Sequence, residues 1–182
     1  TGIHMTVQDC EAYDVAFHPI RIQSGEGIII SGCYFHDNGT GIMLGIKDVA
    51  GVDGVLVEDC VFEDNRGEYN SDGVLVENAT LSRNVLIRDC VSSGNEDGAY
   101  DIKPGVTFLR CIAYGNSNGF KAWRGLTAIN CLSYNNGGTE FELGSFSGSG
   151  TEIKLVGCTA VSAGGRALDI GPNLGTNDAQ YY

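Results

Sequence analysis

The sequence predicts an all-β fold, a right-handed parallel β-helix of about seven coils, and three repeating features indicate it. Each cysteine after the first lies 20 to 30 residues beyond the preceding one. Alternating apolar residues precede every cysteine, and in five of the seven repeats an asparagine follows five residues later. A repeat of short strands and turns without helical periodicity is typical of one coil of such a solenoid. The cysteines are Cys10, Cys33, Cys60, Cys90, Cys111, Cys131 and Cys158.

The first strand of each coil is predicted to lie just before the cysteine. One apolar residue stands three positions before each cysteine, and another stands five positions before it. Alternation with a period of two places these side chains on one face of a strand, which we interpret as the inward face. The residues are Val7, Ile30, Val57, Ile87, Phe108, Ala128 and Leu155, with Met5, Ile28, Val55, Val85, Val106, Leu126 and Ile153.

The asparagines are predicted to occupy the next turn of each coil and to stack as a ladder. Asparagine tolerates the left-handed conformation that a sharp turn needs, so we expect it to adopt that conformation here. Its amide can also bond to the same amide one coil away. The asparagines are Asn38, Asn65, Asn95, Asn116 and Asn136.

A second strand is predicted after this turn, as in GFKAW, GTEFELG and GRALDIG. An outward position falls ten or eleven residues after the cysteine, or fifteen in the Cys60 coil, where the loop Arg66–Asn70 adds four residues. Neighbouring coils stack at about 4.8 Å, so the residues at this position should form one solvent-facing row. The row is Arg21, Met43, Leu75, Asp101, Lys121, Glu142 and Asp169.

The cysteine column permits two interpretations. It could supply metal ligands or disulfides, or it could be a stack of small buried hydrophobic side chains. The number of cysteines is odd, no CxxC pair occurs, and all seven share one inward position. We therefore expect free, buried thiols that stabilise the coil and have no chemistry of their own.

Composition limits the classes of partner. The 182 residues suit a single β-helix domain over 1–182, and the formal net charge is −12. This charge disfavours nucleic acid, and no apolar run approaches the length that spans a bilayer, so we expect no membrane partner. An acidic protein can still bind an acidic polymer through a divalent cation. Because the chain starts at Thr1 in strand-like sequence, we expect a truncated or processed part of a longer chain. We also expect the protein to be secreted and monomeric.

Acidic residues gather where two neighbouring coils turn into the second strand. Asp72 lies in NSDG, Glu96 and Asp97 lie in NEDG, and Asp101 follows in the outward row. Such residues before glycine are also ordinary turn residues. Stacked on adjacent coils, however, their carboxylates would repel one another unless a cation intervened, and Ca²⁺ prefers such oxygen ligands. We therefore predict a calcium site formed by these four residues.

Three segments resemble the calcium-binding and lysine motifs of the family 9 pectate lyases: NSDG at 70–73, NEDGAYDIK at 95–103 and GNSNGFKAWRG at 115–125. The resemblance covers three consecutive coils. It implies Asp72, Glu96, Asp97 and Asp101 as calcium ligands and Lys121 as the catalytic base. The chain departs from the family pattern at Glu96, where aspartate is usual, and at Ala99, which adds one residue before Asp101.

The resemblance implies cleavage of an anionic uronic-acid polymer, such as pectate, by β-elimination. Four further residues are expected to contact the polymer. Trp123 shares the outward parity of Lys121 and could stack on a sugar ring, while Arg124 could bind a uronate carboxylate. Lys103 shares the parity of Asp101 and is an alternative base, and Glu142 stands beside Lys121 in the outward row.

Two other functions remain open from the sequence. A polygalacturonase-like glycoside hydrolase would use two carboxylic groups, and NSDG with Glu96 and Asp97 superficially resembles its site. The histidine flanked by glycines that is expected in such a hydrolase is absent from this sequence, however. A non-catalytic adhesin or carbohydrate-binding segment could keep the cysteine and asparagine ladders for stability alone.

Overall fold

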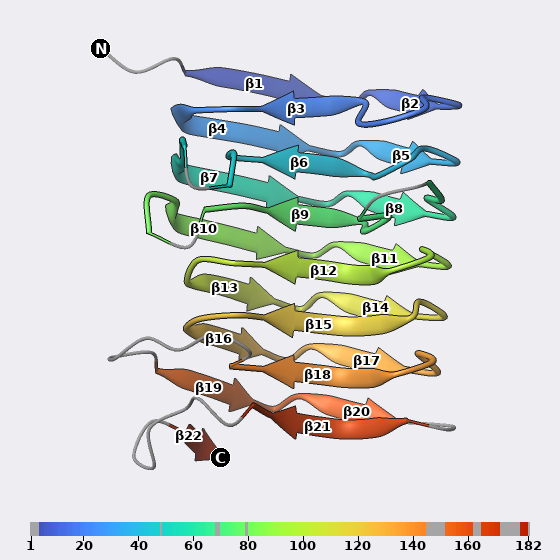
Figure 1. The fold of residues 1–182 in the computed structure, drawn as a ribbon, viewed down its shortest axis with the longest axis vertical. Helices are drawn as coiled ribbons and strands as arrows, with labels where there is room; N and C mark the ends of the chain where they lie inside the picture. The colour runs from blue at the N-terminus through green and yellow to red at the C-terminus, as the bar shows by residue number, and fades with distance from the viewer. Residues whose placement is uncertain are drawn as a thin grey trace.

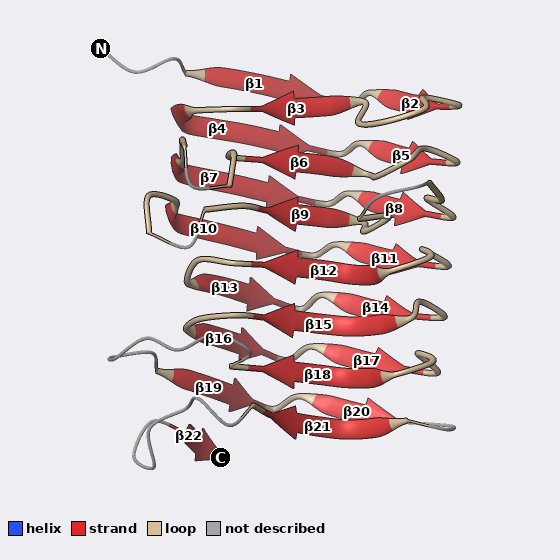
Figure 2. Cartoon of the chain, viewed as in Figure 1, coloured by secondary structure: helices blue, strands red, loops and turns tan. Residues whose placement is uncertain are grey.

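The chain forms a parallel β-solenoid in which successive coils stack along one axis (Figure 1). The computed structural model describes residues 4–47, 49–67, 70–78, 80–144, 152–161, 165–171 and 179–181. These residues contain 22 strands, which form three sheets of eight, seven and seven strands. Every strand pairs with its neighbours in parallel. In Figure 2 the described residues are strands and loops, without a helix. In the described part of the chain there is no helix long and apolar enough to cross a membrane. The predicted all-β fold of about seven coils is confirmed.

Each coil contributes one strand to each sheet. Sheet A contains β1 (Met5–Gln8), β4 (Gly25–Ser31), β7 (Val52–Glu58), β10 (Arg83–Arg88), β13 (Val106–Leu109), β16 (Leu126–Ile129), β19 (Ile153–Val156) and β22 (Ala179–Tyr181). Sheet B contains β2 (Glu11–Tyr13), β5 (Tyr34–His36), β8 (Val61–Glu63), β11 (Val91–Ser93), β14 (Ile112–Tyr114), β17 (Leu132–Tyr134) and β20 (Thr159–Val161). Sheet C contains β3 (Ile20–Ile22), β6 (Ile42–Leu44), β9 (Val74–Val76), β12 (Gly98–Ile102), β15 (Asn118–Ala122), β18 (Thr139–Leu143) and β21 (Arg166–Ile170).

Sheets A and C are the two strands per coil that the repeat predicts, whereas sheet B was not anticipated. Its strands have three residues each and begin directly after the cysteine. Two corners with positive φ bound them. The residue before every cysteine has φ between 52° and 62°, as in Asp9 and Gly32, and a second such residue follows the strand, as in Asp37. Aspartate, asparagine and glycine predominate at both corners because they reach this conformation at low cost.

The ladder asparagines do not adopt the left-handed conformation that we expected of them. The residue before each of them does, and it is Asp37, Asp64, Gly94, Gly115 or Asn135. The asparagine must direct its amide into the coil, so the more exposed residue before it takes the corner. The predicted ladder itself is confirmed: Nδ2 of Asn65 donates to Oδ1 of Asn95 at 2.7 Å, and the same contact links the next two pairs at 2.8 and 3.0 Å.

The interior contains stacked columns of like side chains. All seven cysteines are free, and the five in the middle coils are buried, which confirms the structural interpretation of that column. Cys10 is exposed and Cys158 is half-buried, because they lie in coils near the ends of the stack. In sheet C the rings of Tyr100, Phe120 and Phe141 stack at centroid distances of 4.9 and 5.0 Å. These columns fix the register of the strands that carry the candidate site.

Candidate functional site

The outward row of sheet C has the register that the repeat predicts, but the expectation that the whole row faces solvent is wrong. Leu75 and Asp101 are buried, and the side chains of Lys103, Lys121 and Trp123 contact the carboxylate of Asp101. Lys121 pairs with Asp101 on one side and with Glu142 on the other. The row continues through Leu75 and Met43 toward the N-terminal coils, and at its ends it reaches Arg21 and Asp169. Alternation along β12, β15 and β18 therefore brings three charged side chains together on adjacent strands.

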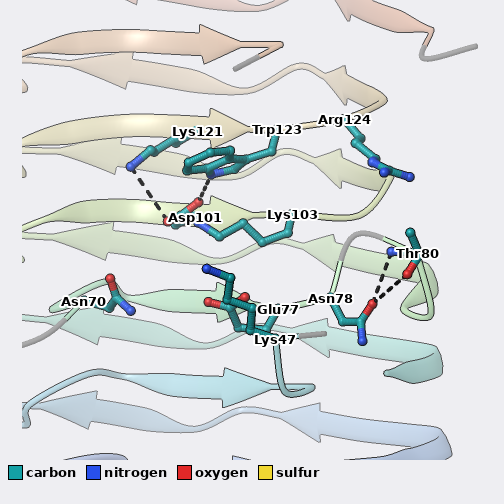
Figure 3. Close-up of a pocket in the computed structure, with 10 residues that line it drawn as sticks. All are labelled: Lys47, Asn70, Glu77, Asn78, Thr80, Asp101, Lys103, Lys121, Trp123 and Arg124. Atoms are coloured by element: carbon teal, nitrogen blue, oxygen red, sulfur yellow. Dashed lines mark hydrogen bonds and ion pairs between the residues drawn. The ribbon is translucent and has the colours of Figure 1, made fainter. Parts of the chain in front are cut away.

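Asp101 is the centre of this group (Figure 3). Its carboxylate is buried, with only 3% of the side chain exposed, and it takes three contacts. Oδ2 lies 2.6 Å from Nζ of Lys103 and 3.8 Å from Nζ of Lys121, and Oδ1 accepts a hydrogen bond from Nε1 of Trp123. The structure thus brings three of the sequence-predicted site residues, Lys103, Lys121 and Trp123, around the carboxylate of a fourth, Asp101.

The two lysines differ in how firmly they are held. Nζ of Lys103 lies 3.9 Å from the centroid of the Trp123 ring, in addition to its short contact with Asp101. Nζ of Lys121 lies 5.4 Å from the same ring. Lys103 is therefore the more firmly held of the two, while Lys121 lies more loosely at the edge of the same group.

Electrostatics at Lys121 favour the ammonium form. Burial alone would lower the pKa of Lys121, but the surrounding carboxylates outweigh it, and the pKa stands above its ordinary value. Asp101 makes the largest of these contributions, followed by Asp97 and Glu142. Neutral Lys121 in the free protein therefore requires an alkaline solution.

Asp72 lies beneath this cluster and is fully buried. Its Oδ1 accepts a hydrogen bond from the backbone N–H of Gly98 at 2.9 Å, whereas its Oδ2 has no hydrogen-bond partner among the described residues. Burial, then the negative charges of Asp101 and Asp97, raise the pKa of Asp72 well above its usual range. A buried carboxylate oxygen without a partner is costly unless a proton or a cation compensates it.

The other predicted ligands lie nearer the surface. Asp97 is half-buried and close enough to contribute to the electrostatics of both Asp72 and Lys121. Glu96 is exposed, with Oε2 3.3 Å from the backbone N–H of Gly67 on the preceding coil. The chemistry of these oxygen donors, and the unpartnered Oδ2 of Asp72, fit a calcium ion. Within the described ranges, however, no three such side chains are already arranged as a metal site.

A pocket of about 430 Å³ is lined by Asp101 and its three partners, and this volume is within the range of about 300–1,000 Å³ usual for ligand sites. Half of the residues that line the pocket are site residues predicted from the sequence: Asp101, Lys103, Lys121, Trp123 and Arg124. The other half is Lys47, Asn70, Glu77, Asn78 and Thr80. These residues follow sheet C strands or lie in the inserted loop, where the repeat does not fix side-chain direction. Extra length in these coils was the one available signal. Four predicted site residues are outside the lining: Asp72, Glu96, Asp97 and Glu142.

The pocket is basic although the protein is acidic. Its lining holds four cations, Lys47, Lys103, Lys121 and Arg124, and two carboxylates, Glu77 and Asp101. The surplus of positive charge lies in a chain of formal net charge −12. Such a local reversal of sign favours an anionic ligand at this place.

Comparison with known proteins agrees with the fold. A family model described as "Right handed beta helix region" matches residues 2–136, which contain every predicted site residue except Glu142. No curated protein and no solved structure matches significantly.

Proposed function

Since this chain belongs to the right-handed β-helix family, we propose that it is a calcium-dependent lyase that cleaves a uronic-acid polymer, such as pectate, by β-elimination. The β-helix fold alone is equally compatible with a hydrolase or an adhesin. The observation that carries the proposal is the position of Lys121, in register between two carboxylates at the edge of a basic pocket. A lysine there can serve as a base, and the pocket suits an anionic polymer.

In the proposed reaction, neutral Lys121 removes the C5 proton of a uronate unit. The proton moves to Nζ, the C5 electron pair forms a C4–C5 double bond, and the C4–O4 bond breaks. The leaving oxygen takes a proton from solvent. Calcium, when bound, would neutralise the uronate carboxylate beside C5 and make that proton more acidic. The candidate ligands for this ion are Asp72, Glu96, Asp97 and Asp101.

Lys103 is better suited to hold charge than to remove a proton. Its contacts with Asp101 and with the Trp123 ring both stabilise the ammonium. We therefore assign Lys103 the task of keeping Asp101 in place and attracting the polymer. Trp123, fixed through Nε1, and Arg124 complete the surface that the sugar would contact. Because uronate polymers of this kind are extracellular, the proposal includes secretion.

The test compares two lysine variants in a cleavage assay that follows unsaturated products by their ultraviolet absorbance. Lys121→Ala should lower kcat by about 10²- to 10⁴-fold, which is the usual contribution of a general base. Lys154→Ala serves as the control, because Lys154 lies in sheet A and pairs with Glu152. If Lys121→Ala keeps a kcat within tenfold of the wild type, Lys121 is not the base.

Product chemistry separates the alternatives. A hydrolase would release reducing ends from the same polymer without ultraviolet absorbance, and a binding segment would release neither. Lys103→Ala should mainly raise KM, because Lys103 is assigned to charge and positioning. A larger loss of kcat in Lys103→Ala than in Lys121→Ala would show that Lys103 is the base and that Lys121 supplies charge and positioning.

A further inference from the structure

We infer that Lys47 binds the carboxylate of a second uronate unit, so that the polymer runs from Lys121 toward the N-terminal coils. This inference rests on the proposed function and adds a substrate-binding residue and a direction. It starts from Lys47, which lines the pocket on a turn closed by the bridge between Ile46 and Ala50. The side chain is exposed, and it makes no ion pair with any described residue.

The turn that carries Lys47 is fastened to a neighbouring turn. Nδ2 of Asn78 donates to the carbonyl of Ile46 at 3.2 Å, and Oδ1 of Asn78 accepts from the backbone and hydroxyl of Thr80. Oγ of Ser82 donates to the carbonyl of Glu77 and accepts from the N–H of Val52. The bonds of Asn78 to Ile46 and of Ser82 to Val52 hold the two turns together, and Figure 3 shows the contacts between Asn78 and Thr80 within the second turn. A lysine on a braced turn loses less freedom when it binds an anion than a lysine on a free loop.

Charge in the pocket points to the same residue. Lys103 and Lys121 both share the carboxylate of Asp101, so their charges are partly compensated. Lys47 has no such partner in the described part of the chain and faces the same space. A carboxylate that enters the pocket would therefore gain most from Lys47 among the three lysines.

The positions along the solenoid give the direction. Lys47 follows β6 and Lys121 lies on β15, so three strand spacings, roughly 14 Å at about 4.8 Å each, separate their coils. This separation suits a polymer that presents a carboxylate on every unit. Beyond Lys121 toward the C-terminus, the outward row offers the carboxylates Glu142 and Asp169. The pocket lysines other than Lys121 are Lys47 and Lys103, and both lie on the N-terminal side of Lys121, so the polymer is expected to extend to that side.

The experiment measures kcat and KM on polygalacturonate for Lys47→Gln, with Lys154→Gln as a control for loss of one charge on another sheet. We expect Lys47→Gln to raise KM about tenfold at unchanged kcat, and to weaken the salt dependence of KM. Glu77→Gln removes a carboxylate from the same pocket and should lower KM. A KM for Lys47→Gln within twofold of that for Lys154→Gln would overturn the inference.

A binding measurement separates this inference from the proposed function. Affinity electrophoresis in gels of polygalacturonate, with a chelator present, reports binding without cleavage. Retardation of the wild type that is reduced in Lys47→Gln supports the subsite even if no unsaturated product is ever formed. Highly methyl-esterified pectin lacks most carboxylates and should retard both proteins equally. Equal retardation of both proteins by polygalacturonate would exclude Lys47 as its binding residue, whatever the activity.

Discussion

At the scale of single residues, the site depends on how the charge of Asp101 is shared. One buried carboxylate holds Lys103 closely, Lys121 more loosely and the indole of Trp123 by a hydrogen bond. Removal of one partner from such a group leaves the others unsatisfied, so single substitutions should have effects larger than the pair contacts alone. The carboxylates around Lys121, the proposed base, therefore raise its pKa above the ordinary value.

Activity should rise with pH in the alkaline range because Lys121 must be neutral to act. Its raised pKa means that the ammonium predominates at neutral pH, and below that pKa the neutral fraction grows about tenfold per pH unit. Glu142→Gln removes one of the carboxylates that raise this pKa, so the profile of kcat/KM should move to lower pH, by up to about one unit. Asp169→Asn, one coil further, is the control. A profile that is unchanged or moves to higher pH in Glu142→Gln would contradict the assignment.

Calcium should stabilise the folded protein through the acidic cluster. A ligand that binds only the folded state adds about 2.7 kcal/mol at one hundred times its Kd. Differential scanning calorimetry with calcium and with chelator should therefore show a higher Tm with calcium. In Asp72→Asn and Asp97→Asn this increase should shrink, and in Asp169→Asn it should persist. An equal increase in all four proteins would place the ion elsewhere.

Residue positions on strands were predictable, and those on loops were not. Two-residue alternation and the repeat spacing were enough to align Asp101, Lys121 and Glu142, because the strands of a solenoid pair in a fixed register. Lys47 and Thr80 were not predicted as pocket residues because they lie on turns of irregular length, where the repeat does not fix side-chain direction. No pattern in the sequence indicates that Asn78 bonds to the turn of Lys47.

At the scale of elements, the asparagine ladder and the cysteine column determine how the coils stack. The ladder ends at Glu140, which is fully buried. Its carboxylate accepts hydrogen bonds from the backbone and the amide of Asn136 and from the hydroxyl of Ser133. Glu140 therefore satisfies the donors that a further asparagine would otherwise have met.

Glu140→Ala should destabilise the end of the ladder. It leaves the buried backbone N–H of Asn136 without its acceptor, whereas the hydroxyl of Ser133 keeps the carbonyl of residue 140 and the amide of Asn136 keeps the carbonyl of Ala113. One unsatisfied buried donor costs about 1–3 kcal/mol, so we expect a loss of this size in the free energy of unfolding. Urea denaturation followed by circular dichroism measures it. Glu63→Ala, on an outward position of sheet B, is the comparison and should cost less. A loss below about 1 kcal/mol for Glu140→Ala would show that the ladder end is not held this way.

The cysteine column should be chemically silent in the folded protein. Burial raises the pKa of the Cys33 thiol, and the next four cysteines along the column are also buried. A thiol reagent with mass-spectrometric counting should modify Cys10 rapidly and Cys158 slowly, while the five buried thiols react only after unfolding. Rapid modification of a middle cysteine would contradict the packing of the column.

Sequence pattern was sufficient for sheets A and C but not for sheet B. A strand of three residues is too short to show alternation, and its ends are marked only by corner residues such as Asp59 and Asp64. An aspartate before a cysteine does not by itself predict a corner, and only its positive φ in the structure shows that one is present. Asparagine and the residue before it both tolerate positive φ, so the sequence could not show which of the two forms the corner.

At the scale of the whole molecule, the solenoid provides a straight surface along which a polymer can lie across several coils (Figure 1). The net charge of −12 would oppose a polyanion, yet the pocket over sheet C is locally positive. Binding should therefore be confined to that surface and should weaken as salt screens the attraction. The fold class could be predicted from the spacing of the cysteines, the apolar alternation before them and the asparagine after them, whereas the local reversal of charge required the folded arrangement of the loops.

We propose that this surface cleaves uronate polymers by elimination with the help of calcium. Incubation of the purified protein with polygalacturonate at alkaline pH tests this proposal, with ultraviolet absorbance followed first with calcium and then with excess chelator. We expect a steady rise in absorbance with calcium that stops when the chelator is added. No calcium-dependent rise on polygalacturonate or on any other uronate polymer would contradict it.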